Sequence, residues 1–258
     1  TVGLGTWAIG GPWQYGWGPQ DDGEAVAGIV AALDAGINWI DTAPAYGLGH
    51  SEELVGQALR RTKHRPIIAT KCGILWNERK EKVVHLKRDS IRRECIASLR
   101  RLGVEQIDLY QMHWPDPPED IEEAWEEMVR LADEGKVKYL GVCNYSVEQI
   151  ERIGRIRPIA SLQPPYSMLR RDVEKELLGY CARHRIGVVA YSPMQRGLLT
   201  GKFSPQRLAA LPADDHRRRM PEFQDPAFSA SLELVESLQK IAQRHGRTVA
   251  QLAISWVL

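Results

Sequence analysis

Short apolar runs alternate along the chain with longer segments in which apolar residues recur at helical spacing. The alternation repeats at intervals of roughly 25 to 40 residues, the size of a strand–helix unit in a parallel sheet. This pattern predicts seven strands, at residues 2–7, 38–43, 66–71, 107–113, 137–143, 161–167 and 187–193.

The segments between these strands carry the signals of amphipathic helices. Gly36, Gly103 and Gly135 follow helical runs, where a residue free to adopt positive φ ends a helix at low cost. Ser146 and Gln149 fit a capping box at the start of another helix. Two apolar stripes are clear, one formed by Val26, Ile29, Val30 and Leu33 and the other by Ile121, Ala124, Trp125, Met128 and Val129.

These elements follow one another without a linker or low-complexity break, so residues 1–258 are predicted to form a single domain. A doubly wound open sheet would also alternate strands and helices, but the first strand–helix turn, residues 5–13, lacks the GxGxxG phosphate loop. We therefore predict an α/β fold of the (β/α)8 TIM-barrel type, with its active site at the carboxyl ends of the strands.

The predicted barrel is incomplete in this chain. Residues 248–258 fit an amphipathic helix that stops without a polar tail, and no eighth strand is visible. We expect the eighth strand and helix to be missing from the sequence, which would leave the first and seventh strands as open edges.

Composition excludes several classes of function. The formal net charge of +1, with 43% hydrophobic and 26% charged residues, gives no bias toward nucleic acid or acidic membranes. Four dispersed cysteines without a CxxC pair predict neither a zinc site nor disulfides, and favour the reducing cytoplasm. No membrane span or secretory signal is predicted. The expected partner is a small molecule, and the chain is expected to be a monomer or a homo-oligomer.

Three consecutive predicted strands end in an ionisable residue: Asp41, Lys71 and His113. Neighbouring strands lie about 5 Å apart, so these side chains are expected to meet at the barrel mouth. Tyr46 follows Asp41 after a short turn that can fold it over the same mouth. Each residue alone also fits a structural role, as a cap or a locally satisfied polar group.

This set suits the reduction of a carbonyl group, because the alkoxide that hydride attack creates must be protonated. Tyr46 is the expected acid, and an adjacent Lys71 ammonium is expected to lower its pKa. Asp41 would keep Lys71 charged and oriented. His113 would polarise the carbonyl or relay the proton.

The same residues resemble the motifs of the aldo-keto reductase superfamily over nearly the whole chain. The sequence Asp-Thr-Ala-Pro-Ala-Tyr-Gly at 41–47, Ala-Thr-Lys at 69–71 and Gln-Met-His-Trp at 111–114 look like that family's Asp, Tyr, Lys and His tetrad. The resemblance implies an NAD(P)H-dependent reductase of aldehydes or ketones. Its catalytic residues would be Asp41, Tyr46, Lys71 and His113.

The resemblance also implies a set of coenzyme contacts. Cys143 stands where serine is common, so its direct contact is left open, and NADP(H) is favoured over NAD(H) by family habit alone. Arg217, Arg218 and Arg219 form either a phosphate clamp or a solvated loop. The implied coenzyme-binding residues are Thr6, Trp7, Asp41, Asn144, Gln163, Tyr191, Ser192, Pro193, Gln195, Arg196, Gly197 and Lys202.

Aromatic residues follow several strands, which predicts an apolar or ring-bearing substrate. They are Trp13, Tyr15, Trp17, Trp76 and Trp114, of which Trp114 is the predicted substrate contact. Two other functions compete with the reductase. One is a coenzyme-binding regulatory or channel-associated subunit with little turnover. The other is a lyase that uses Lys71 to form a Schiff base.

Overall fold

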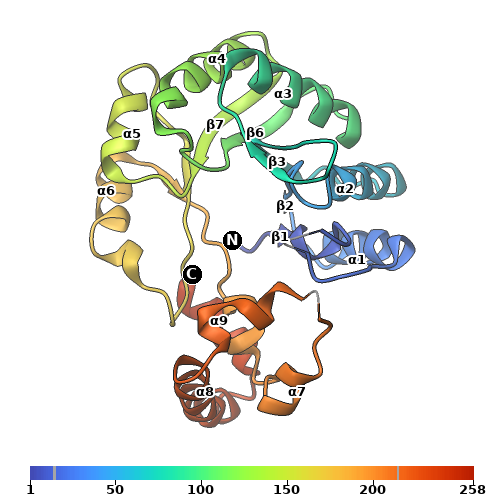
Figure 1. Ribbon diagram of the computed structural model, residues 1–258, viewed down its shortest axis with the longest axis vertical. Helices are drawn as coiled ribbons and strands as arrows, with labels where there is room; N and C mark the ends of the chain where they lie inside the picture. The colour runs from blue at the N-terminus through green and yellow to red at the C-terminus, as the bar shows by residue number, and fades with distance from the viewer. Residues whose placement is uncertain (14–15, 214) are drawn as a thin grey trace.

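A parallel seven-stranded sheet organises the computed structural model, which describes residues 1–13, 16–213 and 215–258 (Figure 1). Its strand order is β1-β2-β3-β6-β7-β8-β9, so each strand pairs with the next strand along the chain except where β4 and β5 intervene. The strands of this sheet are β1 (Leu4–Gly5), β2 (Trp39–Asp41), β3 (Ile67–Cys72), β6 (Ile107–Met112), β7 (Val137–Cys143), β8 (Ser161–Gln163) and β9 (Gly187–Val188).

Within the described ranges no strand joins β9 back to β1, so the sheet curves as an open half-barrel (Figure 1). All seven predicted strands are present, and β7 has the predicted bounds. Four strands are much shorter than predicted, with two residues each in β1 and β9 and three each in β2 and β8. A strand ends where its pairing bonds end, and the sequence pattern does not show that point.

Helices cover the outer face of the sheet (Figure 1). Gly36, Gly103 and Gly135 adopt positive φ as predicted, and Ser146 and Gln149 form the predicted capping box. The α-helices are α1 (Asp22–Asp34), α2 (His50–Arg61), α3 (Arg88–Leu102), α4 (Ile121–Asp133), α5 (Val147–Gly154), α6 (Leu177–His184), α7 (Pro205–Ala209), α8 (Ala227–Arg244) and α9 (Val249–Val257). Short 3-10 helices lie at η1 (Trp7–Ile9), η2 (Pro118–Asp120), η3 (Asp172–Glu174), η4 (Gln195–Thr200), η5 (His216–Arg219) and η6 (Pro221–Phe223).

The main apolar core fills the space between the sheet and helices α1 to α6, with Trp125 and Tyr110 among its largest fully buried side chains. Both predicted apolar stripes supply it. Smaller clusters join η4 to α8 and α9, which lie together on the open side of the half-barrel (Figure 1). No helix in the described part of the chain is long and apolar enough to cross a membrane.

An antiparallel hairpin that the sequence pattern did not predict follows β3. It consists of β4 (Ile74–Trp76) and β5 (Lys82–Val84) and lies outside the main sheet. Each strand has three residues, too few to show the alternation by which a strand is recognised. Gly73, at φ +88°, turns the chain from β3 into the hairpin.

Glu94 of α3 supports this turn from a buried position, with 4% of the residue exposed. Its carboxylate accepts hydrogen bonds from the Gly73 backbone N–H at 2.9 Å and from the Ser90 hydroxyl at 3.1 Å. Burial raises the pKa of Glu94 to about 7, because loss of hydration outweighs these two hydrogen bonds and the nearby arginines. The folded protein therefore holds a proton here more tightly than the unfolded chain does.

Replacing Glu94 with glutamine is expected to raise the free energy of unfolding of the variant relative to that of the wild type as the pH rises. A raised pKa contributes stability in full below the unfolded value of 4.5, and this stability is lost as the pH rises through about 7. Between pH 5 and 8 the loss is on the order of 2 kcal/mol, and the amide variant avoids it. Urea unfolding of wild type and variant at both pH values measures this difference. Glu105→Gln, on an exposed residue, is the matched control. An equal difference at pH 5 and pH 8 would contradict the expectation.

Candidate active site

The side chains of Asp41, Tyr46 and Lys71 meet at the carboxyl ends of β2 and β3. Lys71 is fully buried, and its Nζ donates to Asp41 Oδ2 at 2.7 Å, to the Thr42 carbonyl at 2.9 Å and to Tyr46 Oη at 3.1 Å. These three acceptors match the three N–H donors of an ammonium group. The lysine is therefore fully satisfied without water, and it joins the carboxylate to the phenol.

The charge on Lys71 is maintained by its neighbours. Burial alone would lower the pKa of Lys71, but the Asp41 carboxylate and the Tyr46 hydroxyl raise it, and the net pKa lies above the ordinary value. The strand that carries Lys71 is supported from behind, because Thr70 donates to the buried Glu52 at 2.6 Å. Arg101 also donates to Glu52, at 2.6 Å. Lys71 is therefore a charged donor and not a free amine.

The phenol of Tyr46 keeps its proton across the neutral range. Burial raises the pKa of Tyr46 to about 12, although the adjacent Lys71 ammonium opposes this effect. The prediction that Lys71 lowers the pKa of Tyr46 was correct for that contribution and wrong for the net shift, because the sequence did not show how completely the hydroxyl is removed from water. In this structure Tyr46 is an acid that holds its proton.

His113 lies beside Tyr46 at the end of β6, with the two rings edge to face and 5.9 Å between their centroids. Burial and the charges of Lys71 and Lys82 hold the pKa of His113 well below its usual range. The imidazole is therefore neutral, and a neutral imidazole can offer one N–H to an oxygen atom.

The next three strands bring amide and phenol groups to the same mouth. Gln163 Nε2 donates to Asp41 Oδ1 at 2.8 Å. Asn144, at φ +63°, donates to the His113 carbonyl at 3.1 Å and accepts from the Tyr191 hydroxyl at 2.9 Å. Cys143 is buried next to this group, and burial raises the pKa of its thiol. These side chains are thus held before any ligand arrives.

A cavity of about 920 Å³ opens above these residues. Tyr46, His113 and Trp114 line it at one end, and Trp114 is 41% exposed. Most of the predicted coenzyme residues also line it, namely Thr6, Trp7, Asp41, Asn144, Gln163, Tyr191, Ser192, Pro193, Arg196, Gly197 and Lys202. Lys71 lies behind the wall that Tyr46 and Asp41 form.

The lining of this cavity is strongly cationic. Asp41 is the one acidic residue among its described lining residues, against six basic side chains: Lys82, Arg196, Lys202, Arg207, Arg217 and Arg219. Arg217 pairs with Asp215 at 2.6 Å and lies over the Trp17 ring, 4.5 Å from its centroid. The sequence left the basic run 217–219 open between a clamp and a solvated loop, and the structure places Arg217 and Arg219 on the cavity wall.

The loop after β9 has unusual backbone geometry, with positive φ at Ser192, Gln195 and Arg196. Arg196 pairs with Glu222 at 2.6 Å, while its buried Nε has no protein partner. Gln195 is not among the lining residues, and its side-chain Oε1 accepts from the Ser167 hydroxyl at 3.0 Å. Of the predicted coenzyme-binding residues, Gln195 is therefore the one that the structure does not bring to the cavity.

The predicted aromatic residues divide into two groups. Trp7 packs edge to face against Trp17 and His216, and Trp13 also lines the cavity. Trp76 lies in β4 and is not among the lining residues. Tyr15 lies outside the described residues.

The family of this chain follows from comparison with known proteins. The model of the aldo/keto reductase family matches residues 1–258. The chain belongs to this family. It is therefore an aldo-keto reductase, and its fold is the (β/α) fold of that family.

Named relatives and solved structures agree with this membership. The reductase is 43% identical to the aldo-keto reductase YhdN of Bacillus subtilis, over 100% of this chain and 77% of that protein. It is 34% identical to an NADH-specific methylglyoxal reductase of Escherichia coli, over 100% of this chain and 81% of that protein. The glycerol dehydrogenase AKR11B4 from Gluconobacter oxydans superposes with a TM-score of 0.91 at 43% identity, covering 99% of this chain and 78% of that one. An aldo/keto reductase from Klebsiella pneumoniae in complex with NADP and acetate has a TM-score of 0.70 at 30% identity, covering 99% and 76%.

Sequence reasoning missed several residues around the site of this reductase. Ile74, Lys82, Phe203, Arg207, His216 and Met220 line the cavity from the unpredicted hairpin and from the segment after β9. Gln111, which is buried beside Asp41, was also missed. A signal for Gln111 was available, because it lies two residues before His113 in a strand and therefore on the same face.

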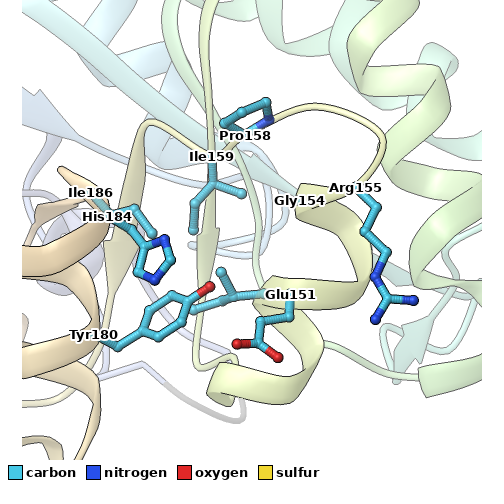
Figure 2. Close-up of a pocket in the computed structure, with 9 residues that line it drawn as sticks. Glu151, Gly154, Arg155, Pro158, Ile159, Tyr180, His184 and Ile186 are labelled. Atoms are coloured by element: carbon cyan, nitrogen blue, oxygen red, sulfur yellow. The ribbon is translucent and has the colours of Figure 1, made fainter.

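A second pocket of about 470 Å³ lies between α5 and α6 on the outside of the reductase (Figure 2). Glu151 lines it from α5, and Arg155 follows the end of that helix. Tyr180 and His184 line it from α6, with their ring centroids 4.1 Å apart. None of the predicted site residues lines this pocket. In the part of the chain that the structure describes, no cluster of His, Cys, Asp and Glu side chains is arranged to hold a metal ion.

Proposed function

We propose that this aldo-keto reductase transfers hydride from NAD(P)H to an aldehyde or ketone, with Tyr46 as the proton donor. The observation that carries the proposal is the phenol of Tyr46, which lines the cavity and accepts a hydrogen bond from the buried, charged Lys71. A group that donates a proton as negative charge develops on oxygen is the requirement of this reaction.

The cavity suits a dinucleotide coenzyme. Its cationic lining complements phosphate groups, and the unpartnered Nε of Arg196 offers a buried donor to an anion. At the other end, Asn144 and Gln163 each keep hydrogen-bonding positions for an amide, and Tyr191 offers a ring face. When bound, the reduced nicotinamide supplies the hydride. Asn144 and Gln163 would hold its carboxamide, and Tyr191 would pack against its ring.

The remaining roles follow from charge and proton position. Tyr46 gives its proton to the carbonyl oxygen, and the Lys71 ammonium stabilises the phenolate that remains. Asp41 holds the ammonium in place through Oδ2. His113, being neutral, donates an N–H to the carbonyl oxygen and orients it toward Tyr46. Trp114 forms the apolar wall against the substrate.

We further propose that NADPH binds more tightly than NADH. Six basic side chains line the cavity, and two of them, Arg196 and Arg217, already pair with acids. The remaining positive charge favours the ligand with the additional phosphate group. The named relatives include both an NADH-specific reductase and a structure in complex with NADP, so direct measurement decides the preference in this chain.

The expected result is saturable quenching of tryptophan fluorescence by both coenzymes, with a lower Kd for NADPH. Addition of an aldehyde or ketone should then oxidise the bound coenzyme. The loss of absorbance of the reduced coenzyme measures this reaction for each member of a panel of carbonyl compounds. Absence of turnover across the panel would favour the coenzyme-binding subunit. Borohydride trapping of substrate on the protein would favour the Schiff-base lyase, which the raised pKa of Lys71 opposes.

A further inference from the structure

Gln111 of β6 is fully buried and lies in the layer of side chains that contains Lys71. Strand register places it beside Lys71 of β3 on one side and Gly141 of β7 on the other. Its Nε2 faces Asp41 Oδ1 at 3.5 Å, yet Gln111 is not among the residues that line the cavity. Gln111 therefore contacts the site through Asp41 and not through the cavity.

The carboxylate of Asp41 is held by donors on both of its oxygens. Oδ2 accepts from Lys71 at 2.7 Å, while Oδ1 accepts from Gln163 at 2.8 Å and more weakly from Gln111. Two amide donors on Oδ1 restrict rotation of the carboxylate, so that Oδ2 stays directed at the ammonium. Gln163 also lines the cavity, whereas Gln111 contacts the carboxylate from the closed side.

The orientation of the Gln111 amide is set by this contact. Its Oε1 is buried without a protein partner, although buried polar atoms are normally paired. Turning the amide over would direct this carbonyl oxygen at the carboxylate and replace an attraction by a repulsion. The side chain therefore keeps its NH₂ group on Asp41 and leaves Oε1 without a protein partner.

Close packing keeps the Gln111 side chain in this place. Gly141 lies between Gln111 and Ser161 in the register of the sheet. A Cβ at position 141 would lie 3.2 Å from Gln111 Cγ and 2.4 Å from Ser161 Oγ. Because Gly141 has no side chain, Gln111 and Ser161 occupy the space that a Cβ at position 141 would take.

We infer that Gln111 is a positioning residue, which fixes the Asp41 carboxylate so that Lys71 stays hydrogen-bonded to the Tyr46 hydroxyl. The inference rests on the proposed function, because it assigns Gln111 an effect on proton donation by Tyr46. It predicts a larger effect on kcat than on coenzyme affinity.

Gln111→Met removes the amide and keeps the length of the side chain. We expect kcat for carbonyl reduction to fall about two- to threefold, the effect of a hydrogen bond at the weak end of the usual range, and the Kd of the coenzyme to change less than kcat. Gln106→Met is the matched control, because Gln106 is exposed and donates to the Gly135 carbonyl far from the cavity. In an Asp41→Ala background, Gln111→Met should cause no further loss, since its route of action is gone.

Gln111→Glu tests the inference by the pH dependence of kcat, which a purely structural role of Gln111 would not change. At neutral pH it places a second carboxylate against Asp41, whose other neighbours include Lys71, Tyr46 and the Cys143 thiol, and kcat should fall more than in Gln111→Met. As the pH is lowered, the introduced carboxyl takes up a proton and donates to Asp41 as the amide did. The ratio of variant to wild-type kcat should therefore rise toward acid pH.

A wild-type kcat in Gln111→Met would overturn the inference, as would an equal loss in the wild-type and Asp41→Ala backgrounds. A pH-independent ratio for Gln111→Glu would also overturn it, and this isosteric variant serves if the methionine variant does not fold. The proposed function is tested separately by wild type and Tyr46→Phe. If these two behave as proposed and Gln111→Met behaves as wild type, only the role of Gln111 is lost.

Discussion

Replacing Tyr46 with phenylalanine is expected to lower kcat for carbonyl reduction on the order of 100-fold or more, the contribution of a general acid. The variant keeps the ring that lines the cavity and loses only the hydroxyl that Lys71 contacts at 3.1 Å. The Kd of the coenzyme should change little, because the basic side chains that line the cavity and the amides of Asn144 and Gln163 are untouched.

Steady-state kinetics and fluorescence titration of the coenzyme together measure this separation of binding from chemistry. Tyr166→Phe is the matched control, since the Tyr166 hydroxyl donates to Glu174 and Tyr166 does not line the cavity. A Tyr46→Phe variant with wild-type kcat would remove Tyr46 from the reaction and transfer the role of acid to another group at the cavity.

Replacing Lys71 with methionine is expected to affect both activity and stability. It leaves Asp41 Oδ2 without its counter-ion in a site where the lysine side chain is 1% and the aspartate side chain 16% exposed. Breaking a buried pair from one side costs about 3 kcal/mol or more. Loss of the ammonium should also lower kcat about 100-fold or more, because the phenolate of Tyr46 then forms without a neighbouring positive charge.

Urea unfolding and kinetics measure the two effects in the same preparation. Lys175→Met is the control, because its pair with Asp172 is exposed, and such pairs contribute about 1 kcal/mol or less. Adding Asp41→Asn to Lys71→Met should restore part of the stability and none of the activity. If the double variant is as unstable as the single one, the lost stability comes from packing and not from the unpaired carboxylate.

The sequence pattern predicted the parallel strands and the place where Asp41, Lys71 and His113 meet, because both depend on local periodicity and on strand ends. Its errors lay where structure depends on distant contacts. Strands β1, β2, β8 and β9 were predicted too long, because a strand ends where pairing with its neighbour stops, which the pattern does not show. The β4–β5 hairpin was missed because its strands have three residues each.

The electrostatics of the site could not be derived from residue types. Proximity of a lysine to a tyrosine suggested a lowered pKa for Tyr46, whereas burial has the larger effect and raises it to about 12. Gln195 matched a coenzyme motif, but the positive φ values of the loop turn its side chain toward Ser167. Both outcomes depend on the depth and direction of a side chain, which a linear pattern does not encode.

The β4–β5 hairpin gives this enzyme a segment whose length can vary without changing the pairing of the strands on either side of it. It is inserted between β3 and β6, which nevertheless pair directly, and it brings Ile74 and Lys82 to the cavity. Insertions, deletions or exchanges within it leave the register of Lys71 and His113 intact. Laboratory evolution aimed at new aldehydes or ketones can therefore begin with this hairpin, provided that Lys82 is kept, because its charge helps to lower the pKa of His113.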